Sequence, residues 1–327
     1  MRDGDRVSRE LALDASGLSR SFGDTVALES VDLTLETGGV FGLLGPNGAG
    51  KTTTVRILTG VLQPDSAEHL RVLGHELPGD VEAVRQRVGV QTDTALYERL
   101  SATDNLTFYG ALYGMSKADA ERSAASLLDR FGLAGRAAEK VGAYSKGMKQ
   151  KVLIARALIA DPDLVFFDEP TAGLDPEAAH ELMAYVRDLS RERGTTFFIT
   201  SHRLEEIESV CTRVGVLAGG RIAAQGAPHE VASAIIPEVR IRVAPAPGAR
   251  LDMEALEALP DVVRALPDDG GAVVQANSRD AIPGLVRAIA AMPHDLVAVA
   301  EEPPTLEEAY LRLMGNGAAS LKGADGS

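Results

Sequence analysis

The sequence predicts an α/β domain with a parallel sheet, followed by a smaller α+β domain. Short apolar runs, typical of buried strands, alternate with stretches of helical spacing and predict the first domain. One such run, Val40–Leu44, leads through a glycine-rich turn into a helical stretch, as in a strand–loop–helix unit. The second domain is predicted by a change of composition after Gly226, where prolines and glycines punctuate a new pattern.

The composition is that of a globular protein. Of 327 residues, 45% are hydrophobic and 24% are charged, and no window approaches the ~18 consecutive apolar residues of a membrane-spanning helix. The charged start of the chain lacks the apolar run of a signal peptide. The single cysteine, Cys211, excludes an internal disulfide and fits a reducing cytosol. The net charge of −14 argues against a nucleic-acid partner, because non-specific binding needs a basic face.

The elements of the first domain follow from hydrophobic periodicity. Apolar and polar residues alternate between positions 11 and 35, which predicts half-buried strands. Val55 and Leu58 lie at helical spacing after the glycine-rich turn, and Gly60 is expected to end that helix. The further predicted elements are a mainly helical stretch at 101–133, a buried strand at 164–167, a helix at Pro176–Arg193 and a strand at 196–200.

The second domain has its own order of elements, β-α-β-β-α-β with one helix appended, which matches the split βαβ arrangement. The predicted strands are 239–243, 262–266, 272–276 and 296–300, and the predicted helices are 251–259, 279–292 and 305–314.

These patterns predict the domain boundaries. We expect the first domain over residues 11–228, with a helical subdomain at about 101–155, and the accessory α+β domain over 236–315. Residues 316–327 are small and polar, and we expect a disordered tail there.

A phosphate-binding loop joins the strand at 40–44 to the helix after it. The segment 45–52 matches the pattern G-x-x-x-x-G-K-[ST] in full. Its glycines let successive backbone N–H groups point inward around phosphate oxygens, while Lys51 reaches the β- and γ-phosphates and Thr52 binds Mg²⁺. The strand before it and the helix after it argue against a chance glycine-rich turn. The predicted nucleotide-binding residues of this loop are Gly45, Pro46, Asn47, Gly48, Ala49, Gly50, Lys51, Thr52 and Thr53.

Two carboxylates follow the apolar strand at 164–167. Asp168 is expected to hold Mg²⁺, so the predicted ligands of the site are ATP and Mg²⁺. Glu169, one residue later, is expected to orient or deprotonate the attacking water. The alternative is that Asp168 and Glu169 are merely solvated acids at the end of a strand. The phosphate loop in the same chain argues against this alternative.

Residues 144–150, Tyr-Ser-Lys-Gly-Met-Lys-Gln, resemble the signature sequence LSGGQ of the ABC ATPases. The segment lies just upstream of the carboxylate strand, as in that family. The variant resembles the form common in drug- and polymer-exporter ATPases, and Ser145 and Gly147 match the motif. In the family this serine and glycine contact the γ-phosphate of ATP held by the opposite subunit. The positions that depart from the motif are Tyr144, Lys146 and Met148.

Other positions match the same family. Asp175, in Gly-Leu-Asp, resembles the D-loop aspartate that couples the two sites of the dimer. His202 resembles the switch histidine, so the resemblance implies Lys51, Glu169 and His202 as catalytic residues. Phe22 occupies the place of an aromatic residue that stacks on adenine, although a core phenylalanine is the ordinary alternative.

The family's Q-loop leaves two possibilities open. Counted from Val88, the usual glutamine position falls on Asp93, while Gln91 lies two residues earlier. Either Gln91 shifts into place and binds the metal, or Asp93 acts through a metal-bound water.

The resemblance covers about residues 11–228 and, more loosely, the second domain. It implies a P-loop NTPase of ABC type with an antiparallel β-subdomain and a helical subdomain. It also implies an ATP-hydrolysing subunit that closes head to tail on ATP with a second copy of itself or a homologous ATPase subunit. The expected membrane partner is a permease of about six transmembrane helices, which places the chain at the cytoplasmic side of the cell membrane.

Three alternatives share these motifs. An importer subunit is the closest, because only the signature variant and the second domain favour export. A chromosome-maintenance ATPase needs a long coiled-coil insertion between Lys51 and Ser145, for which the chain has too few residues. A ribosome-associated factor usually carries two such domains and a basic linker, whereas this chain has one domain and is acidic.

Overall fold

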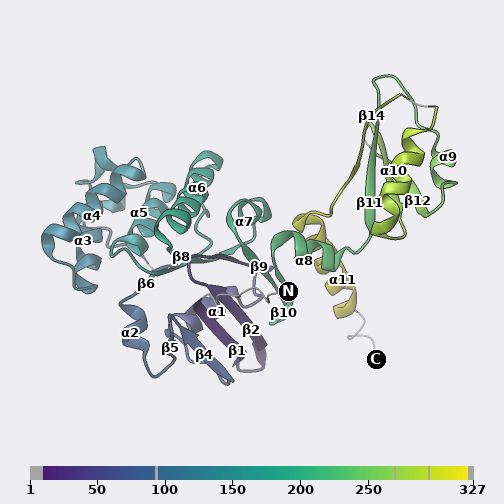
Figure 1. Ribbon diagram of the computed structural model, residues 1–327. Helices are drawn as coiled ribbons and strands as arrows, with labels where there is room; N and C mark the ends of the chain where they lie inside the picture. Colours follow the sequence, from purple (N-terminus) through teal and green to yellow (C-terminus); the bar gives the residue numbers. More distant parts are fainter. Residues whose placement is uncertain (1–9, 93–94, 269, 294, 323–327) are drawn as a thin grey trace, which may run out of the picture. The chain divides into compact units, whose positions relative to one another are not determined.

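The computed structural model describes residues 10–92, 95–268, 270–293 and 295–322, with side chains up to Met314. The chain divides into two compact units, Met1–Pro228 and His229–Ser327 (Figure 1). Among the described helices, none combines the length and the apolar character that crossing a membrane requires.

The first unit begins with an antiparallel sheet. Its order is β2-β1-β4-β5, and the register pairs Leu13 of β1 with Leu35 of β2 and Ala15 with Leu33. These four side chains are at most 2% exposed. The predicted alternation is therefore that of strands with one buried face. The bounds are β1 (Leu11–Phe22), β2 (Thr25–Glu36), β4 (His69–Val72) and β5 (His75–Glu76).

The second sheet of this unit has six strands in the order β10-β9-β3-β8-β7-β6, parallel except for β10. Strands that are buried on both faces have continuous apolar runs in their sequences. In this sheet the rings of Phe41 and Phe198 stack, with 5.2 Å between their centroids. The bounds are β3 (Val40–Leu44), β6 (Val88–Gln91), β7 (Leu164–Asp168), β8 (Thr196–Ser201), β9 (Arg213–Ala218) and β10 (Arg221–Gly226).

Helix α1 (Lys51–Leu58) belongs to the core shared by the two sheets (Figure 1). Val55 and Ile57 are fully buried in one cluster with Leu33 of the antiparallel sheet and Phe166 of the parallel sheet. This packing holds the start of α1 at the carboxyl end of β3, where ligands bind in parallel α/β sheets. A short helix, α2 (Val81–Arg85), precedes β6.

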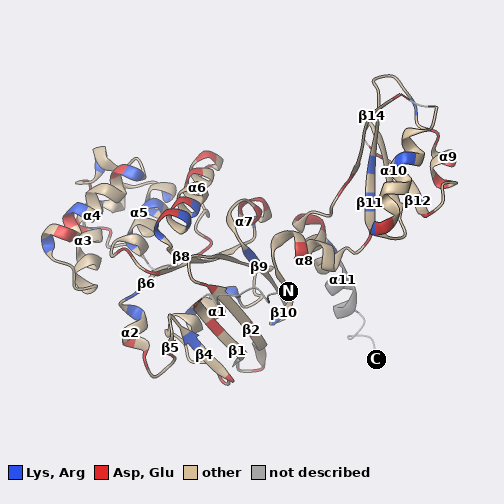
Figure 2. Ribbon diagram, viewed as in Figure 1, with Lys and Arg blue, Asp and Glu red and all other residues tan. Residues whose placement is uncertain are grey.

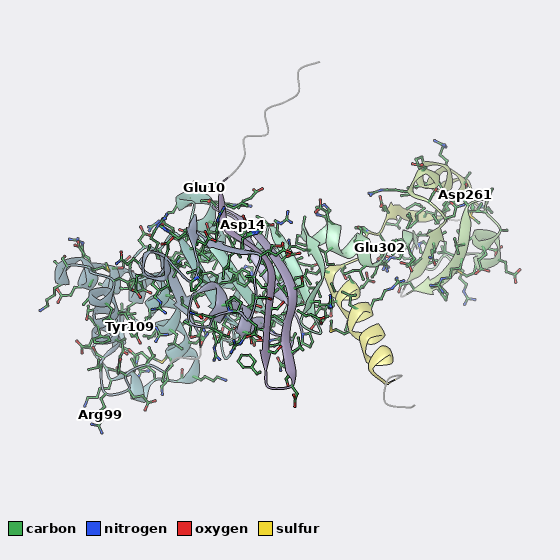
Figure 3. All side chains as sticks on the ribbon, turned by 90° about the horizontal axis from the view of Figure 1, so that it is seen from below. Glu10, Asp14, Arg99, Tyr109, Asp261 and Glu302 are labelled. Atoms are coloured by element: carbon green, nitrogen blue, oxygen red, sulfur yellow. The ribbon has the colours of Figure 1, made fainter. Side chains whose placement is uncertain are left out.

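A helical subdomain lies between β6 and β7 in the sequence. The predicted stretch at 101–133 is two helices, separated where Gly114 takes a left-handed φ of 78°. Ser101 and Asp104 form a capping box at the start of the first helix. Tyr109 (Figure 3) lies 4.7 Å below the guanidinium of the buried Arg156. The helices are α3 (Ala102–Leu112), α4 (Lys117–Arg130) and α5 (Lys146–Leu158), and the unit also contains α6 (Pro176–Arg193) and α7 (Leu204–Val210).

The second unit contains a four-stranded antiparallel sheet in the order β12-β13-β11-β14. Ile241, Val274, Leu285 and Ile289 form its buried core with α10. The predicted fold class, including the split βαβ arrangement, is confirmed. The bounds are α8 (Pro228–Ile235), β11 (Val239–Pro245), α9 (Met253–Glu257), β12 (Val262–Asp268), β13 (Gly271–Ala276), α10 (Ile282–Ala290), β14 (Leu296–Glu301) and α11 (Leu306–Lys322).

Two expectations about the second unit need correction. The tail expected to be disordered at 316–327 differs from the structure up to Lys322, because α11 continues to that residue. Residues 323–327 lie outside the described part of the chain. The unit also begins before the expected boundary at 236, because Ala232 and Ile236 pack with Ala309 of α11.

Candidate nucleotide-binding site

The phosphate loop follows β3 and leads into α1, and its glycines are required by its backbone. Gly48 and Gly50 have φ of 82° and 108°, which side chains other than hydrogen disfavour. A Cβ on Gly50 would lie 2.5 Å from the carbonyl oxygen of Ala27, which excludes a side chain. Gly50 also leaves the first turn of α1 without a side-chain cap. The backbone N–H groups of that turn are therefore available to an anion.

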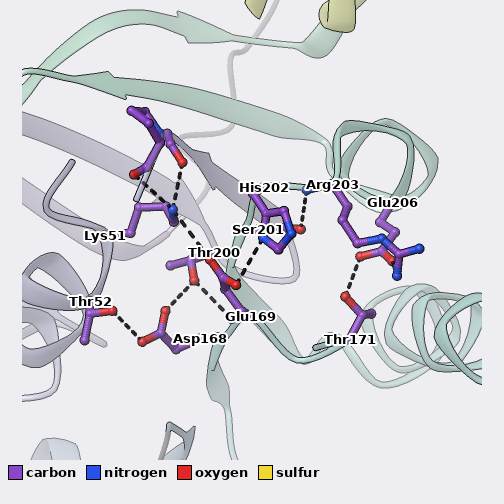
Figure 4. Close-up of polar contacts among 12 residues, drawn as sticks. Lys51, Thr52, Asp168, Glu169, Thr171, Thr200, Ser201, His202, Arg203 and Glu206 are labelled. Atoms are coloured by element: carbon purple, nitrogen blue, oxygen red, sulfur yellow. Dashed lines mark hydrogen bonds and ion pairs between the residues drawn. The ribbon is translucent and has the colours of Figure 1, made fainter. Parts of the chain in front are cut away.

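Lys51 is buried at the start of α1 and is 6% exposed. Its Nζ donates hydrogen bonds to the carbonyl oxygens of Gly45 at 2.7 Å and Pro46 at 3.3 Å. It also lies 3.6 Å from Oε1 of Glu169 (Figure 4). The ammonium group is thus held beneath the loop, beside the carboxylate of the residue that follows β7.

The carboxylate of Asp168 is fixed by two hydroxyl groups. Thr52 Oγ1 donates to Oδ2 at 2.8 Å, and Thr200 Oγ1 donates to Oδ1 at 2.5 Å (Figure 4). The three residues come from α1, β7 and β8, whose ends meet because β7 and β8 are parallel neighbours. Thr52 and Asp168 were predicted as metal ligands, and the structure brings them together.

Gln91 is the last residue of β6, which lies next to β7 on the side opposite β8. It is 2% exposed, and its Nε2 donates to the backbone oxygen of Asp168 at 3.3 Å. Its Oε1 is buried and has no hydrogen-bond partner within the described residues. An unsatisfied buried oxygen is costly, and a cation near it would remove that cost.

These oxygens suit Mg²⁺. Hydroxyl, carboxylate and amide oxygens are the hard ligands that this ion takes in nucleotide sites, together with phosphate oxygens. Thr52, Asp168 and Gln91 are the residues that would hold the ion. When bound, Mg²⁺ would offset the negative charge of the phosphates.

Glu169 and His202 form a second polar pair at the site. Glu169 has a φ of 51°, and its N–H donates to the backbone oxygen of Thr200 at 3.0 Å and to its Oγ1 at 3.1 Å. A non-glycine residue in this region is strained, and such strain is concentrated at functional sites. The backbone turn directs the carboxylate to Lys51 on one side and to His202 Nδ1, 3.1 Å away, on the other (Figure 4).

A cavity of about 230 Å³ opens over the loop. Phe22 stands at its edge at the end of β1 and is 48% exposed, so the alternative of a core phenylalanine does not hold. The guanidinium of Arg20 lies 4.9 Å from the centre of its ring. The residues that line the cavity are Phe22, Ala27, Pro46, Asn47, Gly48, Gly50, Lys51, Thr52, Thr53 and Glu169.

Comparison with known proteins matches this geometry to a family. Residues 28–172 match the family described as ABC transporter. The chain is 36% identical over 320 residues to a daunorubicin resistance ATP-binding protein of Streptomyces coeruleorubidus, covering 94% of this chain and 97% of the relative. The chain belongs to the ATP-binding subunits of ABC transporters.

Further comparisons agree. This ABC subunit is 36% identical over 307 residues to a Nod factor export ATP-binding protein I of Rhizobium johnstonii, covering 93% of this chain and 95% of the relative. A solved ATP-binding subunit of an ABC transporter superimposes with a TM-score of 0.62 at 32% identity, covering 67% of this chain and 91% of the other. The predicted family, the nucleotide-binding function and the enzyme class, an ATPase, are confirmed. Such subunits act with a membrane partner and as dimers.

Three predicted residues of the ABC subunit lie away from the cavity: Ser145, Gly147 and Asp175 do not line it. Ser145 caps α5, and its Oγ accepts a hydrogen bond from Met148 N at 3.3 Å. A Cβ on Gly147 would lie 3.1 Å from the oxygen of Gly173, so the signature segment touches the D-loop segment. Asp93 falls outside the described residues, which leaves Gln91 as the Q-loop candidate with observed contacts.

Asp175 caps α6 with its side chain. Its carboxylate accepts a hydrogen bond from Ala178 N at 2.9 Å, and this bond lowers the pKa of Asp175. The same residue closes the turn that begins beside Glu169, so the D-loop segment is held between the carboxylate strand and a capped helix.

Two residues of the ABC subunit were not predicted. Thr200 bonds both Asp168 and the backbone of Glu169. Its place directly before Ser201 and His202 is the signal that could have identified it. Gln150 Nε2 donates to the backbone oxygen of Pro170 at 2.8 Å and so ties the signature helix to the segment after Glu169.

Proposed function

We propose that this ABC subunit hydrolyses Mg-ATP in a head-to-tail dimer and drives export through a separate membrane permease of about six transmembrane helices. The observation that carries this proposal is that Lys51, Thr52 and Glu169 line one cavity, with Asp168 hydrogen-bonded to Thr52 beside it. Similarity to proteins named for drug resistance and Nod factor export runs through both units of the chain and favours export over import. The subunit would act at the cytoplasmic side of the membrane.

Each group around the cavity has a role in this proposal. Lys51 and the N–H groups of the loop bind the β- and γ-phosphates, and Phe22 stacks on adenine. Mg²⁺ is held by Thr52, Asp168 and Gln91. Glu169 is the general base for the attacking water, and His202 contacts the γ-phosphate.

A second subunit would complete the nucleotide site with residues that the cavity of one chain does not contain. Ser145, Gly147 and Asp175 do not line the cavity of their own chain. The family resemblance assigns Ser145 and Gly147 to the γ-phosphate of a nucleotide and Asp175 to the coupling of the two sites. They would therefore serve the ATP of a facing subunit, either the same chain or a homologue. The uncapped start of α1 and the serine-capped start of α5 would then approach the same triphosphate from opposite sides.

Apolar side chains on the helical subdomain offer a surface for the permease. Tyr97, Phe108 and Leu112 are 47%, 42% and 67% exposed, and the rings of Tyr97 and Phe108 pack edge to face at 5.2 Å. Exposed apolar groups of this kind mark interaction surfaces. Tyr97, Phe108 and Leu112 follow Gln91 in the chain, so binding of the permease to these side chains can be transmitted to the nucleotide site.

The test combines turnover with protein concentration. Lys51→Met removes the ammonium group but keeps the side-chain stem, and we expect turnover to fall by ~10²-fold or more. In the wild-type protein, the rate per subunit should rise with protein concentration, because the complete site forms only when two chains meet. Lys117→Met is the matched control, since the Lys117 side chain is 87% exposed on α4. A rate per subunit that stays constant from dilute to concentrated monomer would contradict the shared site.

A further inference from the structure

Helix α7 directs one of its glutamates inward. The helix contains three glutamates and no Lys or Arg, and its acidic residues are drawn in red in Figure 2. Glu205 and Glu208 are exposed, whereas the side chain of Glu206 is only 13% exposed. The next residue, Ile207, is fully buried and packs on β3, where a Cβ on Gly42 would lie 2.7 Å from it. Glu206 is thus carried by a helix that is fixed to the parallel sheet.

The carboxylate of Glu206 has a partner at each of its two oxygens (Figure 4). Oγ1 of Thr171 donates a hydrogen bond to Oε2 at 2.7 Å, and Thr171 is 3% exposed. Oε1 lies 2.6 Å from Nη1 of Arg203. This oxygen accepts no hydrogen bond from the described residues, so its contact with Arg203 is an ion pair without hydrogen-bond geometry. A largely buried carboxylate needs such partners, because burying an unpaired charge is costly.

The two partners belong to the two segments that carry the proposed catalytic side chains. Thr171 is two residues after Glu169, in the turn that leaves β7. Arg203 directly follows His202, between β8 and α7. Glu169 and His202 are 3.1 Å apart, and Glu206 joins the same two segments a second time. None of these four positions is in a helix or strand, so side-chain contacts fix where the two segments lie.

The two contacts of Glu206 differ in strength. The ion pair with Arg203 joins residues three positions apart, and the Arg203 side chain is 42% exposed, so solvent weakens the attraction. The hydrogen bond from Thr171 joins residues 35 positions apart, starts from a buried hydroxyl group and ends on a charged acceptor. Hydrogen bonds to charged acceptors are the stronger kind. The contact with Thr171 therefore ties α7 to the segment that begins at Glu169.

We propose that Glu206 is a positioning residue for ATP hydrolysis, which holds the segments of Glu169 and His202 at the separation at which both side chains face the same phosphate. Glu206 does not line the nucleotide cavity, so it acts through these two residues. Catalysis is sensitive to such placement, because a shift of about 1 Å can cost ~10²-fold in rate. The inference rests on the roles proposed above for Glu169 and His202.

Two variants of Thr171 test the proposal in the full chain with Mg-ATP. Thr171→Val removes the hydroxyl group but keeps the branched shape of the side chain, whereas Thr171→Ser keeps the hydroxyl group. We expect kcat to fall at least ~10-fold in Thr171→Val and to stay within about twofold of wild type in Thr171→Ser. The Kd for ATP, measured with a fluorescent nucleotide, should stay within about twofold of wild type in both.

A second pair of variants removes the carboxylate itself. Glu206→Ala eliminates both contacts, and Glu205→Ala is the matched control, because Glu205 is exposed on the same helix. We expect kcat to fall at least ~10-fold in Glu206→Ala and to be unchanged in Glu205→Ala. Circular dichroism checks that each variant is folded. If Glu206→Ala does not fold, the comparison of Thr171→Val with Thr171→Ser still decides.

A double-mutant comparison separates positioning from a general structural role. In a chain with Glu169→Gln and His202→Ala, Glu206 has no catalytic side chain left to position. Adding Glu206→Ala should then change the residual single-turnover rate by less than about twofold. The same fall as in the wild-type background would overturn the proposal. So would an unchanged kcat in folded Thr171→Val and Glu206→Ala proteins, or a Kd for ATP that rises by the factor by which kcat falls.

Failure of this inference is distinguishable from failure of the proposed function. If Glu169→Gln alone turns over ATP near the wild-type rate, the proposed base is wrong. If Glu169→Gln is inactive while Glu206→Ala is as active as the wild type, only the positioning role of Glu206 is wrong.

Discussion

Asp168 and Glu169 are neighbours in the chain, but their carboxylates have different surroundings. Both oxygens of Asp168 accept hydrogen bonds from hydroxyl groups, at 2.8 Å and 2.5 Å. Glu169 instead lies between the ammonium group of Lys51 and the ring of His202. A carboxylate fixed among oxygen ligands suits a metal, whereas one beside a cation and an imidazole suits the handling of a proton.

We predict that Glu169→Gln removes hydrolysis but not binding. The amide keeps the size and hydrogen bonding of the side chain and removes the charge that polarises water, so turnover should fall by ~10²–10⁴-fold. Unhydrolysed ATP should then hold the dimer closed. Turnover and the dimer fraction, by size-exclusion chromatography with multi-angle scattering, are measured in Mg-ATP.

Asp168→Asn is the matched comparison for that prediction. It should weaken Mg-ATP binding itself, because the ground-state metal contact is lost. Turnover of Glu169→Gln near the wild-type rate would show that Glu169 is not the base. Failure of Glu169→Gln to bind Mg-ATP would assign it to the metal instead.

A third residue, Gln91, gives a prediction about the metal. Gln91→Leu removes the buried Oε1 that has no partner among the described residues, and the Mg²⁺ concentration for half-maximal ATPase activity should rise ~10-fold or more. Asp93→Asn is the companion variant, and it should change this concentration little. The reverse result would assign the metal contact to Asp93.

At the scale of elements, the start of α6 depends on one side chain. Asp175 accepts a hydrogen bond from Ala178 N, and this bond lowers its pKa in the folded state. Because the folded pKa lies below the unfolded value of about 3.9, the charged cap stabilises the protein above that value. The stabilisation is lost as the pH falls through the folded pKa.

We predict that Asp175→Ala lowers the Tm of the protein by about 2–4 °C at pH 7. Thermal unfolding followed by circular dichroism between pH 3 and pH 7 measures the difference from wild type. That difference should shrink at acidic pH. Asp175→Asn keeps a cap that does not titrate, so it should remain close to wild type at pH 7. A difference between Asp175→Ala and wild type that is independent of pH would show that the charge of the cap contributes nothing.

At the scale of the whole molecule, all residues assigned to the nucleotide belong to the first unit, Met1–Pro228. The buried contact of Ala232 and Ile236 with Ala309 lies entirely within the second unit. Removal of the second unit therefore takes both sides of that contact away together.

We predict that a chain ending at Gly226 still binds ATP, with a Kd within about threefold of the full chain. A fluorescent nucleotide measures this, with Lys51→Met in the same truncated chain as the control for specific binding. Loss of binding in a folded truncated protein would place part of the nucleotide site in the second unit.

The sequence alone determined the phosphate loop, the strand that ends in two carboxylates and the β-α-β-β-α-β order of the second unit. These features depend on local spacing: glycines where the backbone must bend, apolar runs where strands are buried, and helical periodicity where one face packs. The helix at Pro176–Arg193 was predicted to the residue for this reason.

Only the tertiary structure decided which of these groups meet. Thr200 reaches Asp168, and Gln91 reaches the backbone of the same residue, because β7 lies between β8 and β6 in the sheet. The left-handed turn at Glu169 is likewise a product of the assembled sheets, because its N–H bonds to Thr200 of β8. Pairing between strands far apart in the chain depends on the packing of the whole unit, and local spacing carries no information about it.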